Sequence, residues 1–181
     1  METNLQEVNQ PKKNTKRNTR GQEKQLTEKL IQISRVSKVT KGGKKLNFRA
    51  IVVLGDEKGK VGVGVAKADD VINAFKKAKT DGKKQMYSIP LTKTLSIPHS
   101  TTGRFGASKI ILKPGIEGSG VIAGGAVRTV LEVAGIKNVI AKQLGSNNLL
   151  NNARATINAL ESLTTKSEVA KKRNLPIERI N

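Results

Sequence analysis

The chain contains no cysteine and only one histidine, His99. Without cysteine there is no disulfide, no thiolate nucleophile and no cysteine-ligated metal. His99 has no acidic residue or second histidine beside it, and metal or acid–base sites need several such groups. We therefore interpret His99 as structural, and we expect no catalytic residue, no metal and no cofactor.

Aromatic residues are also scarce, at 2% of the chain. This is too few for the base-stacking surfaces with which many small domains bind single-stranded RNA. No run approaches the ~20 apolar residues that cross a bilayer, and no segment has the layout of a signal peptide. The Walker phosphate-binding pattern is absent, and the glycines of residues 59–67 alternate as in a strand, without dinucleotide-binding spacing. We expect no membrane association and no small-molecule substrate.

Acidic residues are few: 14 Asp and Glu stand against 34 Lys and Arg, which gives a net charge of +20. Such a charge attracts polyanions, with nucleic acid as the leading partner and an anionic membrane surface as the second. A basic protein with few stacking side chains reads backbone and shape. This favours folded RNA over a single strand.

Composition divides the 181 residues into four parts. Residues 1–25 are polar and basic without an apolar period, which predicts a disordered basic arm. Residues 26–90 and 91–164 each mix strand and helix patterns, which predicts two small α+β domains with an apolar core each. Residues 165–181 form a polar tail with a short helix near 168–173.

The first half is predicted as β-β-β-α. Strands at 30–36 and 46–54 flank a basic turn at 37–45, and a hairpin turn at 56–59 leads to a third strand. In that strand Gly62 and Gly64 leave one face bare, so another element packs closely there. Asp69 or Asp70 caps the helix that follows. The helical period turns these side chains inward: Val71, Ile72, Ala74, Phe75 and Ala78. A short strand at 87–92 bridges the halves.

The second half is predicted as strand, GRFG turn, strand, glycine-rich turn, helix, strand and helix, with one βαβ crossover. Ile110 and Leu112 alternate with lysines as in a strand. The next helix buries an apolar stripe and stops at Gly135, and Ser146 or Asn147 caps the last helix. Glu132, between apolar neighbours, is expected to pair with a Lys or Arg rather than act as a base.

Two stretches are candidate binding sites. The first is the basic turn at 37–45, where lysines flank a double glycine with free N–H groups; we favour RNA contact there over an ordinary solvated turn. The second is the glycine-rich turn before the second helix. Its glycines either only permit tight packing or leave backbone open to phosphate or another chain, and the charge of the chain favours the latter. Its candidate residues are Gly118, Gly120, Gly124, Gly125 and Arg128.

Four segments together resemble ribosomal protein S5 of the bacterial-type small subunit. They are RVSKVTKGGKKLNF, VVLGDEKGKVGVGVAKA, the IPH and GASKIILKPGIEGSGVIAGGAVRTVLEVAGIKNV run, and LGSNNLLNNARATINAL. They cover residues 30–163 in order. The resemblance implies a double-stranded-RNA-binding-like N-terminal domain and a C-terminal β-α-β-α domain with a left-handed βαβ unit, against the usual right-handed preference. The source is expected to be a bacterial cytoplasm or a plastid stroma.

The resemblance also implies a role and partners. The role is structural, at the neck of the small subunit, with an influence on decoding accuracy. The partners are small-subunit rRNA, ribosomal proteins S4 and S8, and nearby mRNA where it enters. The glycine-rich turn would contact S4, and the tail would reach S8. The expected rRNA-binding residues are Ser37, Lys38, Lys41, Gly42, Gly43, Lys44 and Lys45, with Arg49 and Lys67 nearer the mRNA.

Two other classes of function remain open at this point. One is a free-standing double-stranded-RNA-binding or ribosome-assembly protein. The other is a nucleotide-dependent enzyme that uses the glycine-rich turn, for which we expect no micromolar ATP binding.

Overall fold

The computed structural model describes residues 26–176 and residue 179. Residues 1–25, for which the sequence predicts a disordered basic arm, lie outside the described residues, as do 177–178 and 180–181 of the tail. The elements are β1 (Thr27–Thr40), β2 (Gly43–Gly55), β3 (Lys60–Ala68), α1 (Val71–Lys84), β4 (Met86–Ser88), β5 (Thr101–Phe105), β6 (Ser108–Pro114), β7 (Val121–Ile122), α2 (Gly125–Ala134), β8 (Val139–Gly145), α3 (Leu149–Glu161) and α4 (Lys166–Arg173).

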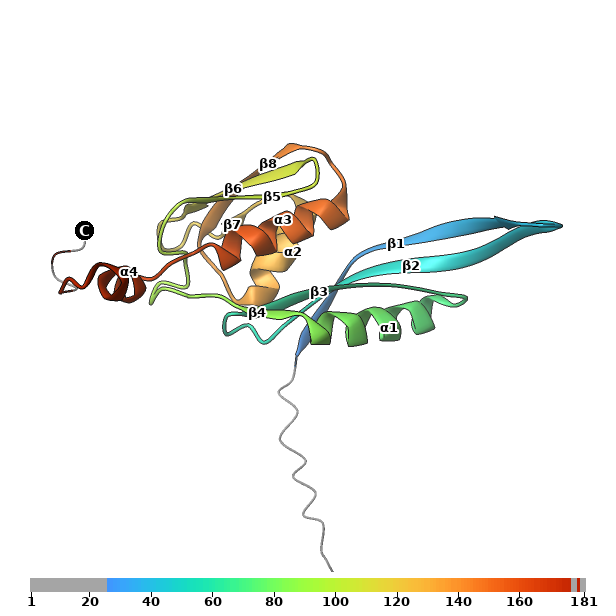
Figure 1. Ribbon diagram of the computed structural model, residues 1–181, viewed down its shortest axis with the longest axis horizontal. Helices are drawn as coiled ribbons and strands as arrows, with labels where there is room; N and C mark the ends of the chain where they lie inside the picture. Colours follow the sequence, from blue (N-terminus) through green and yellow to red (C-terminus); the bar gives the residue numbers. More distant parts are fainter. Residues whose placement is uncertain (1–25, 177–178, 180–181) are drawn as a thin grey trace, which may run out of the picture.

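Two four-stranded sheets form the frame. The first has the order β1-β2-β3-β4 and is antiparallel throughout, and the second has the order β5-β6-β8-β7 with one parallel pair, β7–β8. The layers are α1, the first sheet, the α2–α3 pair and the second sheet (Figure 1). The predicted βαβ crossover is β7-α2-β8, and its left-handed sense stays a prediction.

The bare face of β3 decides where α1 lies. A Cβ added at Gly64 would lie 2.0 Å from the carbonyl oxygen of Ala78, and one at Gly62 would lie 2.6 Å from that of Gln85. Helix and strand backbones therefore touch, as the alternation of glycine predicts. The contact uses the narrow stripe of Ala74, Ala78 and Gly82, all of them buried.

This narrow stripe makes one prediction about α1 wrong. Ile72 is 68% exposed and Val71 is 37% exposed, although the helical period turns both inward. They lie at the start of the helix, beyond the bare strand face. Asp70 is the N-cap residue by position, but its side chain makes no capping hydrogen bond.

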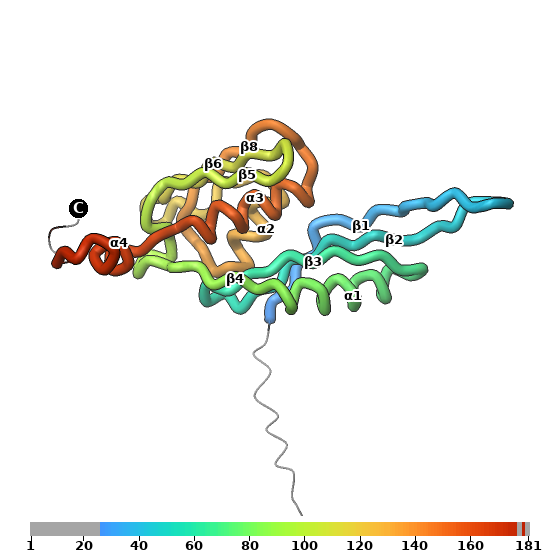
Figure 2. Tube along the Cα trace, in the orientation of Figure 1, coloured from blue at the N-terminus to red at the C-terminus, as the bar shows by residue number. Residues whose placement is uncertain are grey.

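The predicted basic turn at 37–45 is wrong over most of its length. β1 runs on to Thr40 and β2 begins at Gly43, so only Lys41 and Gly42 form the turn. The register continues to the end, with Lys38 opposite Lys45 and Thr40 opposite Gly43. The segment is a two-stranded projection beyond the layers (Figures 1 and 2). We call residues 37–45 the finger.

Smaller differences affect element ends. The predicted bridging strand at 87–92 is β4, which pairs with β3 in the first sheet. The predicted GRFG turn is mostly strand β5, with the turn at Gly106 and Ala107. The cap of α3 is Asn148, whose Oδ1 accepts the N–H of Leu150, in place of the predicted Ser146 or Asn147.

The larger apolar core is shared by both halves rather than confined to one. Ile51 and Val53 of the first sheet cluster with Val130 and Leu131 of α2, while the smaller cluster under α1 belongs to the first half alone. The Asp56–Gly59 turn reinforces this junction, because the N–H groups of Glu57 and Gly59 bond the carbonyls of Val133 and Ala134 at 3.2 and 2.9 Å. These bonds satisfy carbonyls that the end of α2 leaves free.

Candidate nucleic-acid interface

The lysines of the finger are exposed to solvent. Its candidate residues Ser37, Lys38, Lys41, Gly42, Gly43, Lys44 and Lys45 are all exposed. Its sequence has four lysines and no acidic residue. Gly42 adopts φ of +105°, and a Cβ added at either glycine would meet nothing within 4 Å. The backbone at the tip is therefore open to a ligand.

Cations face one another across the strands at two levels. Lys38 lies directly opposite Lys45, and Arg49 lies directly opposite Lys67. Lys45 and Arg49 are four residues apart in β2, so both pairs lie on the same face of the sheet. Like charges in directly opposite positions disfavour the pairing. A bound polyanion would relieve that repulsion at both levels.

Arg49 has a further unsatisfied group. Its Nε, and the Oγ of its cross-strand neighbour Ser34, are buried without a hydrogen-bond partner among the described residues. Buried polar atoms of this kind are uncommon in native proteins. The two unpaired atoms lie side by side at the base of the finger, beneath the exposed surface.

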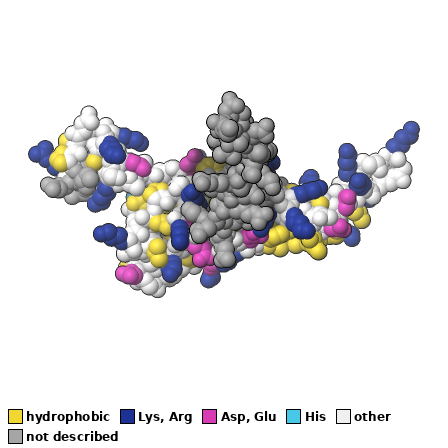
Figure 3. Space-filling model, turned by 90° about the horizontal axis from the view of Figure 1, so that it is seen from below, with side chains coloured by type: hydrophobic (Ala, Val, Ile, Leu, Met, Phe, Trp, Pro, Cys, Tyr) yellow, Lys and Arg dark blue, Asp and Glu magenta, His cyan; other side chains and the backbone are white. Residues whose placement is uncertain are grey.

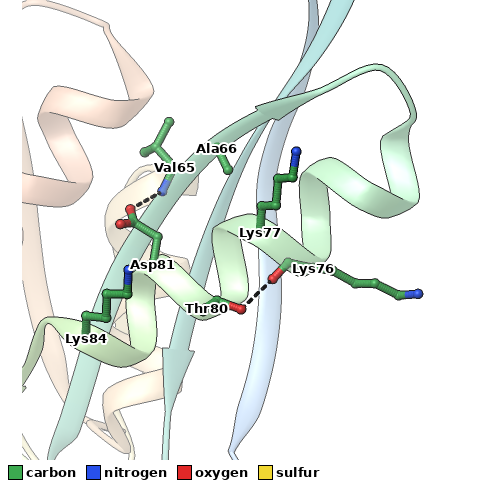
Figure 4. Close-up of a pocket in the computed structure, with 7 residues that line it drawn as sticks. All are labelled: Val65, Ala66, Lys76, Lys77, Thr80, Asp81 and Lys84. Carbon is green, nitrogen blue, oxygen red and sulfur yellow. Dashed lines mark hydrogen bonds between the residues drawn. The ribbon is translucent and has the colours of Figure 1, made fainter.

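A shallow hollow beside α1 adds more cations. It has a volume of about 450 Å³ and lies between helix α1 and strand β3, with Lys76, Lys77 and Lys84 on its rim (Figure 4). Asp81 Oδ2 accepts the N–H of Val65 at 3.1 Å and so occupies the free edge of β3. The sequence places these lysines on the solvent side of the helix, but it does not predict the hollow.

The same side of the molecule has an apolar strip. Figure 3 shows it beside Lys and Arg side chains toward the finger. The exposed apolar residues of this end include Val39 (73%), Leu46 (50%) and Ile72 (68%). Val39 and Leu46 lie on the face of the finger opposite Lys38 and Lys45, so a partner that wraps around the finger would bury apolar area as well as neutralise charge.

The glycine-rich turn is the second candidate site. Gly118 and Gly120 have φ of +85° and +73°, which side chains rarely adopt, and both positions are open. Gly125 is also open and begins α2, whereas a Cβ at Gly124 would lie 2.8 Å from Gln143 Oε1. Three of the four predicted glycines are therefore open, and Gly124 lies against the flexible end of the Gln143 side chain.

Arg128 lies on the first turn of α2 and takes part in an ion network. Its Nε donates to Glu132 Oε1 at 2.7 Å, and Lys29 Nζ donates to Glu132 Oε2 at the same distance. The predicted pairing of Glu132 is confirmed. Because Lys29 belongs to β1, this network ties the glycine-rich turn to the first half of the chain.

Two carboxyl groups, those of Glu132 and Asp56, have lowered pKa values. Hydrogen bonds from Lys29 and Arg128 hold the pKa of Glu132 below its ordinary value. At Asp56, burial alone would raise the pKa, but the N–H groups of Lys60 and Lys58 outweigh it and the pKa is lowered. Both groups are therefore charged at neutral pH and support structure, in the hairpin turn and at α2.

His99 links distant segments. Its Nε2 accepts the N–H of Thr164 at 3.2 Å, and its Nδ1 lies 3.0 Å from the carbonyl oxygen of Ser100. These contacts fit the structural role predicted for His99, at the point where the chain leaves α3. The described residues contain no cluster of three potential metal ligands, and none of their helices has the length and apolar character to cross a membrane.

The two candidate sites do not meet. The finger projects from one end, and the glycine-rich turn lies beside β7, away from the tip (Figure 1). They are two separate surfaces on one body, joined through the shared core and the Lys29–Glu132 pair.

Comparison with known proteins places the chain in a family. The model described as "Ribosomal protein S5, N-terminal domain" matches residues 26–90, and that described as "Ribosomal protein S5, C-terminal domain" matches residues 103–173. The chain belongs to the ribosomal protein S5 family. Members of this family are structural rather than enzymatic, and the predicted α+β class is confirmed.

Relatives extend the match over nearly the whole chain. The small ribosomal subunit protein uS5c of Phaeodactylum tricornutum is 72% identical over 97% of this chain and 99% of its own length. The uS5c of Trieres chinensis is 70% identical over 97% and 95%. The uS5 of the cyanobacterium Gloeothece citriformis is 64% identical over 90% and 94%. Plastid and cyanobacterial forms are thus both represented, in line with the two sources that the sequence allowed.

Proposed function

We propose that this chain is a structural component of the small ribosomal subunit that binds rRNA through the finger. Two like-charged cross-strand pairs carry the proposal, Lys38–Lys45 and Arg49–Lys67. A free protein gains nothing from these arrangements, whereas a phosphate backbone placed over that face is attracted by both pairs. The names of the relatives, which are small-subunit proteins, agree with this reading.

The site of assembly we propose is the neck between the body and the head of the subunit. The finger would reach rRNA there, and Arg49 and Lys67 at its base would border the path of mRNA. Open backbone at Gly118, Gly120 and Gly125 would contact ribosomal protein S4. The tail, whose helix α4 buries little besides Ala170, would contact S8.

Co-sedimentation tests the assembly. The tagged chain should sediment in equal amount with small subunits after a high-salt wash, in a cyanobacterial host that carries it in place of its own relative. A free-standing double-stranded-RNA-binding or assembly protein would wash off, or would remain only on immature particles. Either result would exclude a permanent structural role.

Arg128→Leu tests the role in accuracy. It removes a cation from the ion network and from the proposed S4 contact, so we expect higher stop-codon readthrough in a reporter assay, several-fold above the parent. Thr129→Ser, its neighbour on α2, is the matched control. Normal readthrough in assembled Arg128→Leu subunits would exclude the proposed part of this contact in decoding.

A further inference from the structure

The second sheet has one face that no described element covers. Helices α2 and α3 pack on its inner face, where Ile110, Leu112 and Val139 are buried. The residues that alternate with these point the other way, because successive side chains of a strand leave opposite faces of the sheet. In Figure 1 this outer face is the free side of β5, β6 and β8, opposite the helices.

The strand register assigns the residues of the outer face. Three rows of side chains cross this face, each over three of the four strands, and cations alternate with apolar side chains along β6 and β8. The rows are Arg104–Lys109–Leu144, Thr102–Ile111–Lys142 and Lys113–Ile140–Ile122. The face therefore has four cations, four aliphatic side chains, one threonine and no acidic residue.

Two properties of this face are unfavourable in the isolated chain. Arg104 lies directly opposite Lys109, a like-charge pair of the kind seen in the finger. Ile122, Ile140 and Leu144 are 55%, 43% and 40% exposed, and they belong to neighbouring strands. A flat, anionic partner on this face would neutralise the facing cations and cover the exposed aliphatic side chains.

We propose that the outer face of the β5-β6-β8-β7 sheet binds a second segment of RNA, separate from the one at the finger. The absence of acidic side chains from the rows selects a polyanion. The minor groove of an RNA duplex is wide and shallow, and it displays 2′-hydroxyls and base edges between two lines of phosphates. A flat face can lie along such a groove, and the lysines on either side of Ile111 in β6 would then face the phosphates. The inference rests on the proposed RNA-binding function and adds a surface to it.

A charge-removal experiment tests the surface in the full chain. Arg104→Gln, Lys113→Gln and Lys142→Gln are combined in one variant. Its matched control combines Lys58→Gln, Lys93→Gln and Lys137→Gln, which remove the same charge from turns and loops outside the rows. The probe is cyanobacterial small-subunit rRNA made by transcription, and affinity is measured by filter binding across a range of salt.

We expect the sheet variant to reduce the salt slope of log affinity by about 2–3, since each lost phosphate contact removes about 0.9. The control should change the slope by less than half as much, and neither variant should unfold below the parental temperature. Equal slopes for the sheet variant and the control would overturn the proposal, because general charge would then explain the whole effect.

A site-directed probe gives a second measurement that needs no charge removal. Because the chain has no cysteine, Lys142→Cys and Lys41→Cys each create one unique thiol for an iron chelate that cleaves nearby RNA. In assembled subunits we expect the two probes to cut different rRNA segments. Cleavage of rRNA from Lys41→Cys alone would overturn the second surface. Failure of both probes to cut RNA would overturn the proposed function as well.

Discussion

Replacing Lys45 by glutamine should stabilise the free protein and weaken its RNA complex, two effects of opposite sign from one change. Lys45 faces Lys38 across the finger, and directly opposite Cβ atoms in antiparallel strands lie about 4.5–5.5 Å apart. If the ammonium groups spread to about 8 Å, their repulsion in water is about 0.5 kcal/mol. At 0.15 M salt, where the Debye length is about 8 Å, roughly 0.2 kcal/mol remains.

The loss on the RNA side is larger. A lost phosphate contact reduces the salt slope by about 0.9, which corresponds to an affinity about eightfold weaker at 0.1 M salt. Thermal unfolding at low and high salt measures the first effect, and filter binding of small-subunit rRNA across the same range measures the second. Lys58→Gln is the control, because Lys58 is an exposed lysine of the Asp56–Gly59 turn that faces no other cation in the register.

Two results would refute this reasoning. A Lys45→Gln protein that unfolds at a lower temperature than the parent in low salt would show that the facing lysines do not repel. An unchanged salt slope for RNA would show that Lys45 touches no phosphate, and the finger would then lose its place in the proposed interface.

Three further outcomes are expected. Gly64→Ala should cost about 2–3 kcal/mol of unfolding free energy in denaturant titration, because its Cβ would lie 2.0 Å from the backbone oxygen of Ala78; a cost below ~1 kcal/mol would contradict the close packing. Gly43→Val, at an open position of ordinary φ, should leave stability within ~0.5 kcal/mol but weaken rRNA binding in filter assays by shielding backbone N–H groups; parental affinity would argue against that contact. Acid should destabilise the protein: the pKa of Glu132 is depressed in the folded state, so its stabilisation is complete above the ordinary value of 4.5 and is lost as pH falls through the folded pKa. Glu132→Gln should therefore flatten the dependence of melting temperature on pH in that range, and a curve parallel to the parent's would exclude the ion network as its source.

The sequence predicts those parts of the fold that depend on a single residue or on the periodicity of a single helix or strand. The bare strand face at Gly62 and Gly64 predicts the close helix, and Gly135 predicts the stop of α2, where φ is +88°. The pairing of Glu132 follows in the same way, because a carboxylate on a largely apolar helix in a basic chain finds a cation.

Other features depend on distant parts of the chain. Lysine and glycine have low strand propensity, so the sequence predicts a turn over residues 37–45, yet pairing with β1 keeps β2 extended from Gly43. The exposure of Ile72 depends on how far along the helix the bare face of β3 extends. The helical periodicity of α1 gives no information about that length. The outer face of the second sheet was missed for a related reason: Lys109, Ile111 and Lys113 form part of a surface only once β8 lies beside them.

The finger also has a mechanical consequence. Strand β2 reaches the buried region only at Ala50, nine residues after Lys41 of the turn, and at about 3.3 Å per residue this is a lever of about 30 Å. Tilting the body by one degree would sweep the tip of a lever of this length through about half an ångström. A slight rocking of the domain against its neighbours would thus be magnified where the lysines touch their target.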